Sequence, residues 1–282
     1  MNMKAVLITG CSSGIGLSTA KLLKNKGWNI FATARNEKDL SMLSELGFNT
    51  IFLDITDTNS VKNCAKEVIY RSNGNLCALV NNAGIGVPGA IEDLNRNSMI
   101  KQFEVNLFGL LELTNMLIPH LLKKSHARII NVSSVVGRIA VPFMGIYSAS
   151  KFALEAATDA QRIELANTPI QVSLIQPGPI YSNFSKSCLK IVENLSTNLE
   201  SRYNKQYNKY YRERLANHLT EDRFRLKPEA VSKKILHALE SKNPKVRYKV
   251  TIPAYVIEFL VRFFPKFVTD QFFKKQISSY TK

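Results

Sequence analysis

Lys4-Ala5-Val6-Leu7-Ile8-Thr9-Gly10-Cys11-Ser12-Ser13-Gly14-Ile15-Gly16 is the N-terminal segment from which the fold class can be predicted. An apolar run leads into a turn that holds three glycines. Glycine permits a tight turn and lets backbone N–H groups approach a pyrophosphate closely. A helix that begins there offers the anion its free N–H groups and positive dipole end. We interpret this turn as a dinucleotide-binding loop, a plain strand-to-helix turn being the alternative. Its candidate contacts are Gly10, Ser12, Ser13, Gly14, Ile15 and Gly16.

Outward from this turn, apolar runs alternate with amphipathic helical stretches. Near-continuous apolar runs suit parallel strands that are buried on both faces. We expect strands at Lys4–Thr9, Asn29–Ala34, Thr50–Leu53, Leu76–Asn81, Arg128–Ser133 and Ile170–Ile175, with an edge strand at Val246–Val250. Helical patterns lie between them, for example at Gly14–Lys26, Ser60–Tyr70, Ser98–Lys123 and Tyr147–Ala166. The alternation predicts an α/β fold with a doubly wound parallel sheet and right-handed crossovers.

Length and composition indicate one domain, spanning 1–282, because 282 residues with 45% hydrophobic content can bury a sizeable core. Residues 185–227 are polar and basic, with helical periodicity around Leu199–Leu219, and read as an insertion over the sheet. The first apolar run is too short for a signal peptide, and no run reaches the roughly 18 apolar residues of a membrane span. Four cysteines without a CxxC pair and four scattered histidines indicate reduced thiols and no metal site. We therefore expect a cytoplasmic protein.

Charge is distributed unevenly along the chain. The formal net charge is +16, and residues 185–282 hold 21 Lys and Arg against 9 Asp and Glu. Such asymmetry indicates an anionic partner or surface, or else a well-solvated face. Nucleic acid is not among the partners that we expect, and formation of a homo-oligomer is left open.

The cofactor preference is read from Ala34-Arg35-Asn36, at the end of the second expected strand. An NAD site usually has an acidic residue here, which binds the ribose 2′-hydroxyl. This chain has none, and the Arg35 guanidinium can pair with a 2′-phosphate instead. We therefore expect NADP(H), the alternative being a surface arginine at a strand end.

Tyr147 and Lys151 stand four residues apart at the start of an expected helix, so their side chains share one face. An ammonium beside a phenol favours the phenolate, and we expect it to lower the pKa of Tyr147 from about 10 toward neutrality. A tyrosine tuned in this way can pass a proton to or from a reacting oxygen. Ser134, thirteen residues before Tyr147, adds a hydroxyl that can bond the same oxygen.

Together these motifs resemble the single-domain short-chain dehydrogenases/reductases, which share a Rossmann-type sheet. The motifs lie in order across about the first 185 residues: Thr9–Gly16, Asn81-Asn82-Ala83-Gly84, Asn106, Ser134, Tyr147, Lys151 and Pro177-Gly178-Pro179-Ile180. The segment from Ser134 to Glu155 is similar to the seventeen-beta-hydroxysteroid and retinol dehydrogenase-like branch, and to bacterial NADP-dependent aldehyde reductases.

The resemblance implies that residues after several strands hold the cofactor. These are Asp54 and Ile55 at the adenine, Asn82, Ala83 and Gly84 along the adenosine, and Pro177, Gly178 and Ile180 beside the nicotinamide. Tyr147 and Lys151 would also contact the cofactor, Lys151 at the nicotinamide ribose. Asn106 would hold a water that links Lys151 to solvent. Ser182 stands where the family often has a threonine, and we expect it at the carboxamide or a phosphate.

We expect an NADP(H)-dependent oxidoreductase that interconverts a carbonyl compound (an aldehyde or a ketone) and the corresponding alcohol. Tyr147 would donate the proton, Ser134 would orient the oxygen and Lys151 would tune Tyr147, with Asn106 completing the catalytic set. One alternative is a non-catalytic NADP-binding sensor or scaffold on the same fold, which the intact set disfavours. Another is a sugar-nucleotide epimerase or dehydratase, which the glycine spacing and the chain length disfavour.

Apolar side chains near the expected pocket walls indicate a lipophilic substrate, unless they belong to the core. They are Phe143, Met144, Phe184 and Leu189. A steroid, a retinoid and an aliphatic aldehyde all fit this description.

Residues 251–282 form an amphipathic extension. Its apolar residues recur at helical spacing, at Ile257, Leu260, Val261 and Phe264, and Glu258 and Arg262 share another face. The cations that follow are Lys266, Lys274 and Lys275. An apolar helix flanked by cations is typical of a peripheral segment at a membrane interface. The alternative is that this face packs on the sheet or on a partner subunit and covers the substrate cleft.

Overall fold

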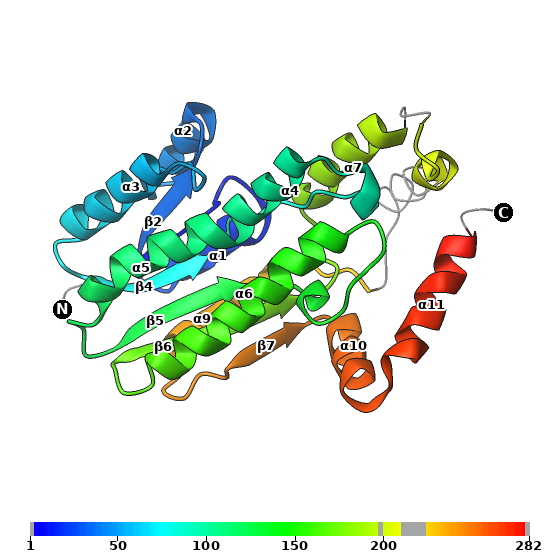
Figure 1. Cartoon of the computed structure of the whole chain (residues 1–282). Helices are drawn as coiled ribbons and strands as arrows, with labels where there is room; N and C mark the ends of the chain where they lie inside the picture. The colour runs from blue at the N-terminus through cyan, green and yellow to red at the C-terminus, as the bar shows by residue number, and fades with distance from the viewer. Residues whose placement is uncertain (1–2, 197–199, 210–223, 280–282) are drawn as a thin grey trace.

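The computed structural model describes residues 3–196, 200–209 and 224–279. A parallel seven-stranded sheet in the order β3-β2-β1-β4-β5-β6-β7 forms its centre (Figure 1). The strands are β1 (Ala5–Ile8), β2 (Asn29–Ala34), β3 (Asn49–Phe52), β4 (Leu76–Asn81), β5 (Ala127–Val132), β6 (Ile170–Pro177) and β7 (Arg247–Val250). The predicted doubly wound α/β fold is confirmed. All residues of β1 and β5 are buried, which explains their near-continuous apolar sequence.

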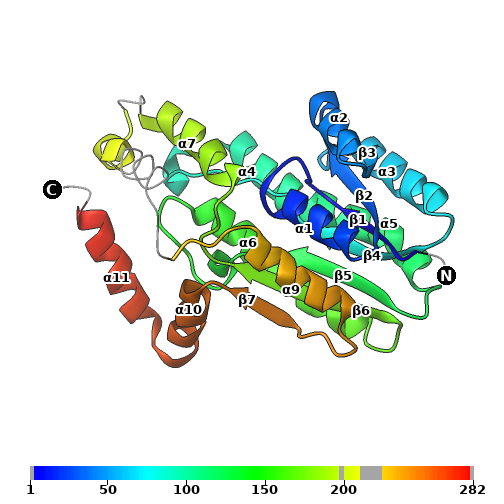
Figure 2. The ribbon, with the colours of Figure 1, turned by 180° about the vertical axis from the view of Figure 1, so that it is seen from behind.

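Helices cover both faces of the sheet (Figures 1 and 2). One face packs against α1 (Gly14–Asn25), α2 (Glu37–Glu45) and α9 (Glu229–Glu240). The other packs against α3 (Thr58–Arg71), α5 (Gly109–Leu121) and α6 (Gly145–Glu164). The chain reverses its direction of travel along the sheet at β1, which has β2 on one side and β4 on the other. Ligands of such sheets bind at this switch point, beyond the carboxyl ends of the strands.

The expected helix at Ser98–Lys123 is not one regular helix. It consists of α4 (Arg96–Phe103), a π-helical turn at Glu104–Phe108, and α5. A π turn within an α-helix often marks a functional site. Here it contains Asn106.

Three further helices add to the sequence prediction. The helical stretches named as examples from the sequence do not include α2 and α9. The helix α7 (Asn183–Ser196) begins two residues before the expected start of the insertion. The helical periodicity expected around Leu199–Leu219 falls mostly outside the described residues.

The last two helices, α10 (Ile252–Phe263) and α11 (Lys266–Ser279), follow the edge strand β7. They lie beyond the carboxyl end of the sheet, on the same side as α7 (Figures 1 and 2). Among the helices of the described ranges, none combines the length and the apolar composition needed to cross a bilayer.

Candidate active site

The glycines of the β1–α1 turn adopt conformations or contacts that a side chain would disturb. Gly10 and Gly14 have φ of 69° and 56°, in the left-handed region that favours glycine. A Cβ on Gly16 would lie 2.2 Å from the carbonyl oxygen of Gly10. The turn therefore brings backbone, not side chains, to the start of α1.

Thr9 fixes this turn against the segment after β4. Its hydroxyl accepts hydrogen bonds from the backbone N–H groups of Asn82 and Ala83, both at 2.9 Å. The Asn82 amide donates to the carbonyl oxygens of Thr9 and Gly10 at 2.9 and 3.0 Å. The expected adenosine-side residues are thus held directly beside the glycine turn.

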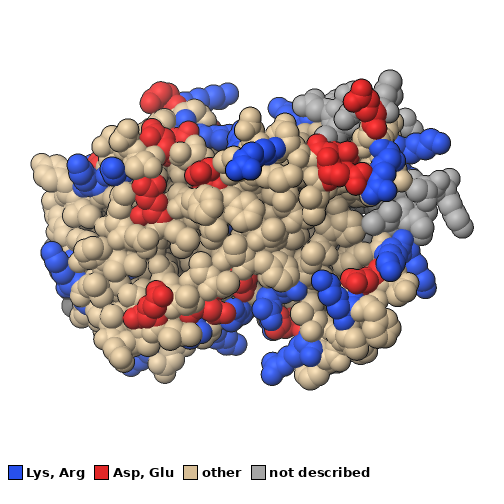
Figure 3. Space-filling model, viewed as in Figure 1, with Lys and Arg blue, Asp and Glu red and all other residues tan. Residues whose placement is uncertain are grey.

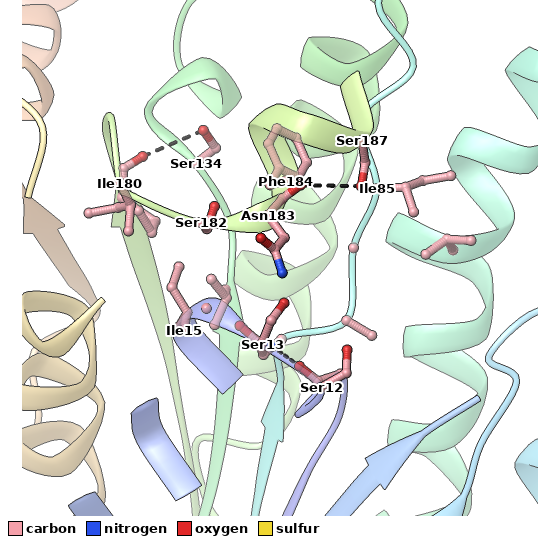
Figure 4. Close-up of a pocket in the computed structure, with 18 of the residues that line it drawn as sticks. Ser12, Ser13, Ile15, Ile85, Ser134, Ile180, Ser182, Asn183, Phe184 and Ser187 are labelled. Carbon is pink, nitrogen blue, oxygen red and sulfur yellow. Dashed lines mark hydrogen bonds between the residues drawn. The ribbon is translucent and has the colours of Figure 1, made fainter. Parts of the chain in front are cut away.

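A cavity of about 570 Å³ opens from this turn across the carboxyl ends of the central strands. Its lining includes every expected cofactor residue except Gly16, which instead packs against the backbone of Gly10 and the side chain of Asn82. Ser12 and Ser13 lie across the cavity from Ser182 and Asn183 at the start of α7 (Figure 4). Among the described residues, Ser13 makes no side-chain cap on α1. The helix N-terminus therefore faces a space where an anion can bind.

The adenosine end of the cavity contains the exposed Arg35 and the carboxylate of Asp54. Asp54 accepts hydrogen bonds from the backbone N–H and the hydroxyl of Thr56 at 3.0 and 2.8 Å. The backbone bond from Thr56, with a smaller contribution from the Arg35 charge, holds the pKa of Asp54 below its usual range. Asp54 is therefore a fixed anion beside Arg35.

Ser134 and Tyr147 meet in the middle of the cavity. Ser134 caps a short 3₁₀ turn at Val135–Gly137, and its hydroxyl donates to the carbonyl oxygen of Pro177 at 3.5 Å. Tyr147, in the first turn of α6, lines the same cavity, where the Ser134 hydroxyl favours the ionised form of its phenol. Its ring lies 5.3 Å from that of Phe184. The two hydroxyls can therefore reach one substrate oxygen.

The expected lowering of the Tyr147 pKa is wrong for this structure. Burial raises the pKa of the phenol well above its usual range, and the nearby Ser134 hydroxyl only partly opposes this. Lys151 does lie on the same helix face, but its Nζ is 6.0 Å from the centre of the Tyr147 ring and donates to the carbonyl oxygen of Val132 at 2.9 Å. Desolvation of the phenol therefore sets the direction of its pKa shift.

Lys151 is buried, and this burial lowers the pKa of its ammonium to about 8. The carboxylate of Glu155, one helical turn later, opposes the shift. Glu155 is itself buried, and it pairs with Arg247 at 3.0 Å and accepts hydrogen bonds from Gln176. Sequence reasoning missed this network, although a charged residue four positions from Lys151 was a signal for it.

Asn106 projects from the π turn and is fully buried. Its Oδ1 accepts from the backbone N–H of Ile85 at 2.9 Å, and its Nδ2 donates to the Ile85 carbonyl and to Ser150 at 3.0 and 3.2 Å. A Cβ on Gly84 would lie 3.4 Å from Asn106 Oδ1 and 3.8 Å from Lys151 Nζ. Asn106 and Lys151 therefore both lie next to Gly84.

Polar strand residues beneath the cavity form a second set that sequence reasoning missed. The Asn81 amide donates to Thr114 and Asn131 at 2.9 and 2.8 Å, and the Asn131 amide donates to Thr158 at 2.9 Å. Buried polar groups are stable only when they are hydrogen-bonded. An asparagine inside the apolar run Ile129–Val132 was the available signal.

Pro177, Gly178 and Ile180 line the opposite end of the cavity. The N–H of Gly178 donates to the carbonyl oxygen of Val250 at 3.0 Å, and a Cβ on Gly178 would lie 2.1 Å from the hydroxyl of Thr251. This end of the cavity is therefore built against the junction of β7 and α10.

The four expected substrate-side residues divide into two groups. Met144, Phe184 and Leu189 line the cavity. Phe143 is instead buried against Tyr203 and Tyr207, with ring centres 5.5 and 5.3 Å apart. Phe143 thus belongs to the core beneath residues 200–209.

Comparisons with known proteins agree with this arrangement. The family model for short chain dehydrogenases matches residues 4–190. The uncharacterized oxidoreductase YbbO of Escherichia coli (strain K12) is 39% identical over 268 residues, covering 95% of this chain and 93% of that protein. Retinol dehydrogenase 16 of Mus musculus is 32% identical over 277 residues, covering 95% of this chain and 86% of that protein.

Solved structures share the fold. A short-chain dehydrogenase from Streptomyces avermitilis has a TM-score of 0.79 at 24% identity, covering 100% of this chain and 99% of its own. A Burkholderia phymatum enzyme in complex with NAD has a TM-score of 0.77 at 24% identity, covering 93% and 92%. A Burkholderia cenocepacia enzyme in complex with NADP has a TM-score of 0.71 at 23% identity, covering 93% and 94%. With the family match and the two relatives, they show that the chain is an oxidoreductase of the short-chain dehydrogenase/reductase family, in its retinol dehydrogenase-like branch.

Proposed function

We propose that the chain interconverts a carbonyl and an alcohol of a lipophilic substrate with NADP(H) as its cofactor. The observation that carries the proposal is the placement of the Tyr147 and Ser134 side chains in one cavity, with the buried Lys151 one turn after Tyr147 on the same helix. A hydroxyl pair of this kind can bind one reacting oxygen and exchange a proton with it.

The residues of the cavity fit a dinucleotide. A Cβ on Gly10 would lie 2.9 Å from Ala83 Cα, and one on Gly14 would lie 3.2 Å from Ser182, so backbone N–H groups are the nearest donors to a bound pyrophosphate. Val105, Ile55 and Leu53 supply apolar surface at the adenine end. When bound, the nicotinamide supplies or accepts the hydride.

Arg35 supports a preference for NADP(H) over NAD(H). Its guanidinium lines the cavity at the end of β2, and Asn36 after it caps α2 by accepting from the N–H of Asp39 at 2.9 Å. The Asp39 carboxylate accepts from the Asn36 amide at 2.7 Å, so this acid is already engaged. A 2′-phosphate beside Arg35 would gain a charge-assisted hydrogen bond.

The protonation states of Tyr147 and Lys151 support a proton donor. Because burial raises the pKa of Tyr147, the phenol carries its proton at neutral pH, as donation to a carbonyl oxygen requires. Lys151, with its pKa lowered to about 8, holds its own proton at neutral pH and can return one to Tyr147 through bound hydroxyls or water. Ser134 orients the oxygen that receives the proton.

The cavity wall on the α7 side supports a lipophilic substrate. Met144, Phe184 and Leu189 contribute apolar side chains there, next to the Tyr147 hydroxyl. The name of one relative, retinol dehydrogenase 16, refers to an apolar alcohol, and an apolar cavity wall would suit a substrate of that kind.

The test is a steady-state assay of NADPH and NADH oxidation with a medium-chain aldehyde, retinaldehyde and a ketosteroid. We expect turnover with at least one substrate, and an apparent KM for NADPH at least tenfold below that for NADH. Absence of turnover in both directions with all three substrates would overturn the carbonyl–alcohol assignment. Equal use of the two cofactors would overturn the assignment of Arg35.

A further inference from the structure

The last two helices carry an apolar surface that the fold leaves exposed. We call it the aromatic face, and it is made of Ile252, Tyr255, Val256, Phe259, Phe263, Phe264, Phe267 and Phe272. Phe263, Phe267 and Phe272 have 63%, 65% and 67% of their surface exposed. Contiguous apolar surface on this scale marks an interaction site more often than chance exposure.

The inner side of α10 is already used by the fold. Ala254 is buried, and Glu258 pairs with Arg138, which follows the 3₁₀ turn after Ser134, at 3.3 Å. Ile257 and Leu260 are half-buried. Of the apolar face that the sequence predicts, only these two residues are partly covered by the domain, whereas Val261 and Phe264 are exposed. The aromatic face is additional apolar surface, on the side that points away from the sheet.

Cations border the aromatic face. The guanidinium of Arg262 lies 5.8 Å from the centre of the Phe263 ring, and Lys249 Nζ lies 5.7 Å from that of Tyr255. Lys266, Lys274 and Lys275 follow along α11. Figure 3 shows Lys and Arg side chains around a lobe of uncharged residues at the lower right, where α10 and α11 lie in Figure 1. The acids of the two helices are Glu258, which is turned inward to Arg138, and Asp270.

We infer that the aromatic face docks the protein on an anionic lipid surface. Helices of 12 and 14 residues with exposed aromatic side chains and a cationic border suit the interface plane of a bilayer. Anionic headgroups complement the border, and each cation near such a surface adds to binding. A second copy of this chain is a poorer occupant, because a two-fold contact would bring Arg262 and Lys266 toward their own counterparts.

The attachment of α10 orients the cavity toward the same surface. Thr251, which joins β7 to α10, has φ of 88°, an uncommon conformation for a residue with a side chain. Its hydroxyl lies 2.1 Å from where a Cβ on Gly178 would be, so the helix begins at the wall of the cavity. Docking would bring the cavity close to the lipid. This orientation matters for an apolar substrate, a step that rests on the proposed function.

The test is co-sedimentation of the full chain with vesicles of phosphatidylcholine, with and without phosphatidylglycerol. Wild type should bind the anionic vesicles at low salt and lose most of that binding at high salt. The double variant F263S/F267S should bind at least tenfold more weakly. The matched control Y70S/I163S, which removes exposed apolar side chains from α3 and α6, should bind as wild type does.

A second pair of variants tests the cationic border. Removing two cations in R262Q/K266Q should weaken binding to anionic vesicles by on the order of fivefold per charge. The control K62Q/K66Q removes two exposed lysines of α3 and should leave binding unchanged. Thermal unfolding of each variant checks that it is folded.

Three outcomes would overturn the inference. They are the absence of binding by wild type to anionic vesicles at low salt, equal binding by wild type and F263S/F267S, and a lipid-free dimer of wild type that F263S/F267S converts to monomer. The last would assign the aromatic face to a second copy. Turnover of a soluble aldehyde is measured separately without vesicles, so failure of lipid docking and failure of the proposed function are distinguishable.

Discussion

Around the cavity polar side chains are buried, whereas on α10 and α11 apolar side chains are exposed. Asn106, Ser150 and Lys151 have 5% or less of their surface exposed, and Phe267 and Phe272 have about two thirds. Neither arrangement is favourable for folding by itself, since buried polar groups lose their hydration and exposed apolar groups stay in contact with water. We infer that each region is organised around something other than the stability of this chain: a bound molecule in one and an external surface in the other.

The largest effect in this comparison between the cavity and the aromatic face is expected at Tyr147. Tyr147→Phe retains the ring and removes the hydroxyl, so turnover should fall about 10²–10⁴-fold because proton transfer is lost. Cofactor binding should be retained. Turnover under saturating NADPH and NADPH titration by fluorescence measure the two effects. Tyr70→Phe on the surface of α3 is the control, and turnover of Tyr147→Phe near that of the control would contradict the role of the hydroxyl.

Arg35 tests whether the adenosine end of the cavity selects its ligand. Arg35→Ala should weaken NADPH binding by about 1.5–3 kcal/mol, the range for a hydrogen bond to a charged group, which is on the order of 10–100-fold. NADH binding should change little, because NADH has no 2′-phosphate. Calorimetric titration with both cofactors measures this. A parallel loss of affinity for NADH would show that Arg35 acts on the fold and not on the phosphate.

Lys151 tests whether the buried polar groups oppose stability. At pH 7 the folded protein holds this ammonium in a buried site that lowers its pKa from 10.5 to about 8. Each pKa unit is about 1.4 kcal/mol, and the hydrogen bond to Val132 returns about 1 kcal/mol. Lys151→Met should therefore raise the free energy of unfolding by about 2 kcal/mol while abolishing turnover. Glu155 retains Arg247 as its partner in this variant.

The stability difference between Lys151→Met and wild type should also depend on pH, in a direction that follows from the lowered pKa of Lys151. Between pH 8 and 10.5 the unfolded chain binds a proton at Lys151 and the folded chain does not, so the stability of wild type rises with pH through this window. The advantage of Lys151→Met should accordingly shrink from pH 8 upward. Urea unfolding at pH 7 and pH 9.5 measures it. A variant that is less stable than wild type at pH 7 would contradict the burial argument.

The smallest effect is expected on the aromatic face. Phe267→Ala should change the free energy of unfolding by no more than about 0.5 kcal/mol, as for other exposed positions. Phe31→Ala, in the buried strand β2, should lower it by about 3–5 kcal/mol. Urea unfolding of both variants measures the contrast. A large loss in Phe267→Ala would mean that α11 packs more tightly than its exposure indicates.

The sequence predicted the sheet because its central strands are buried on both faces and therefore mostly apolar, whereas the edge strands β3 and β7 are only partly buried. The order of motifs also led to the cavity residues, since most of the motifs follow a strand of a parallel sheet. What could not be predicted depended on distance and burial. Lys151 stands four residues from Tyr147, but only the structure shows its ammonium on the Val132 carbonyl, with burial setting both pKa values. The position of Phe143 likewise depends on residues 200–209, which are distant in sequence.

The π turn at Glu104–Phe108 sets the rotational phase of two helices. An α-helix advances by about 100° per residue, so one additional residue in a turn rotates everything after it by that amount. Gln102 before the turn can therefore face the loop that holds Val87, while Thr114 after it faces the sheet at Asn81. Deleting one residue within the turn would restore a continuous α-helix and misalign one half against its neighbours. A residue inserted or deleted anywhere between Gln102 and Thr114 should consequently break one of these two contacts.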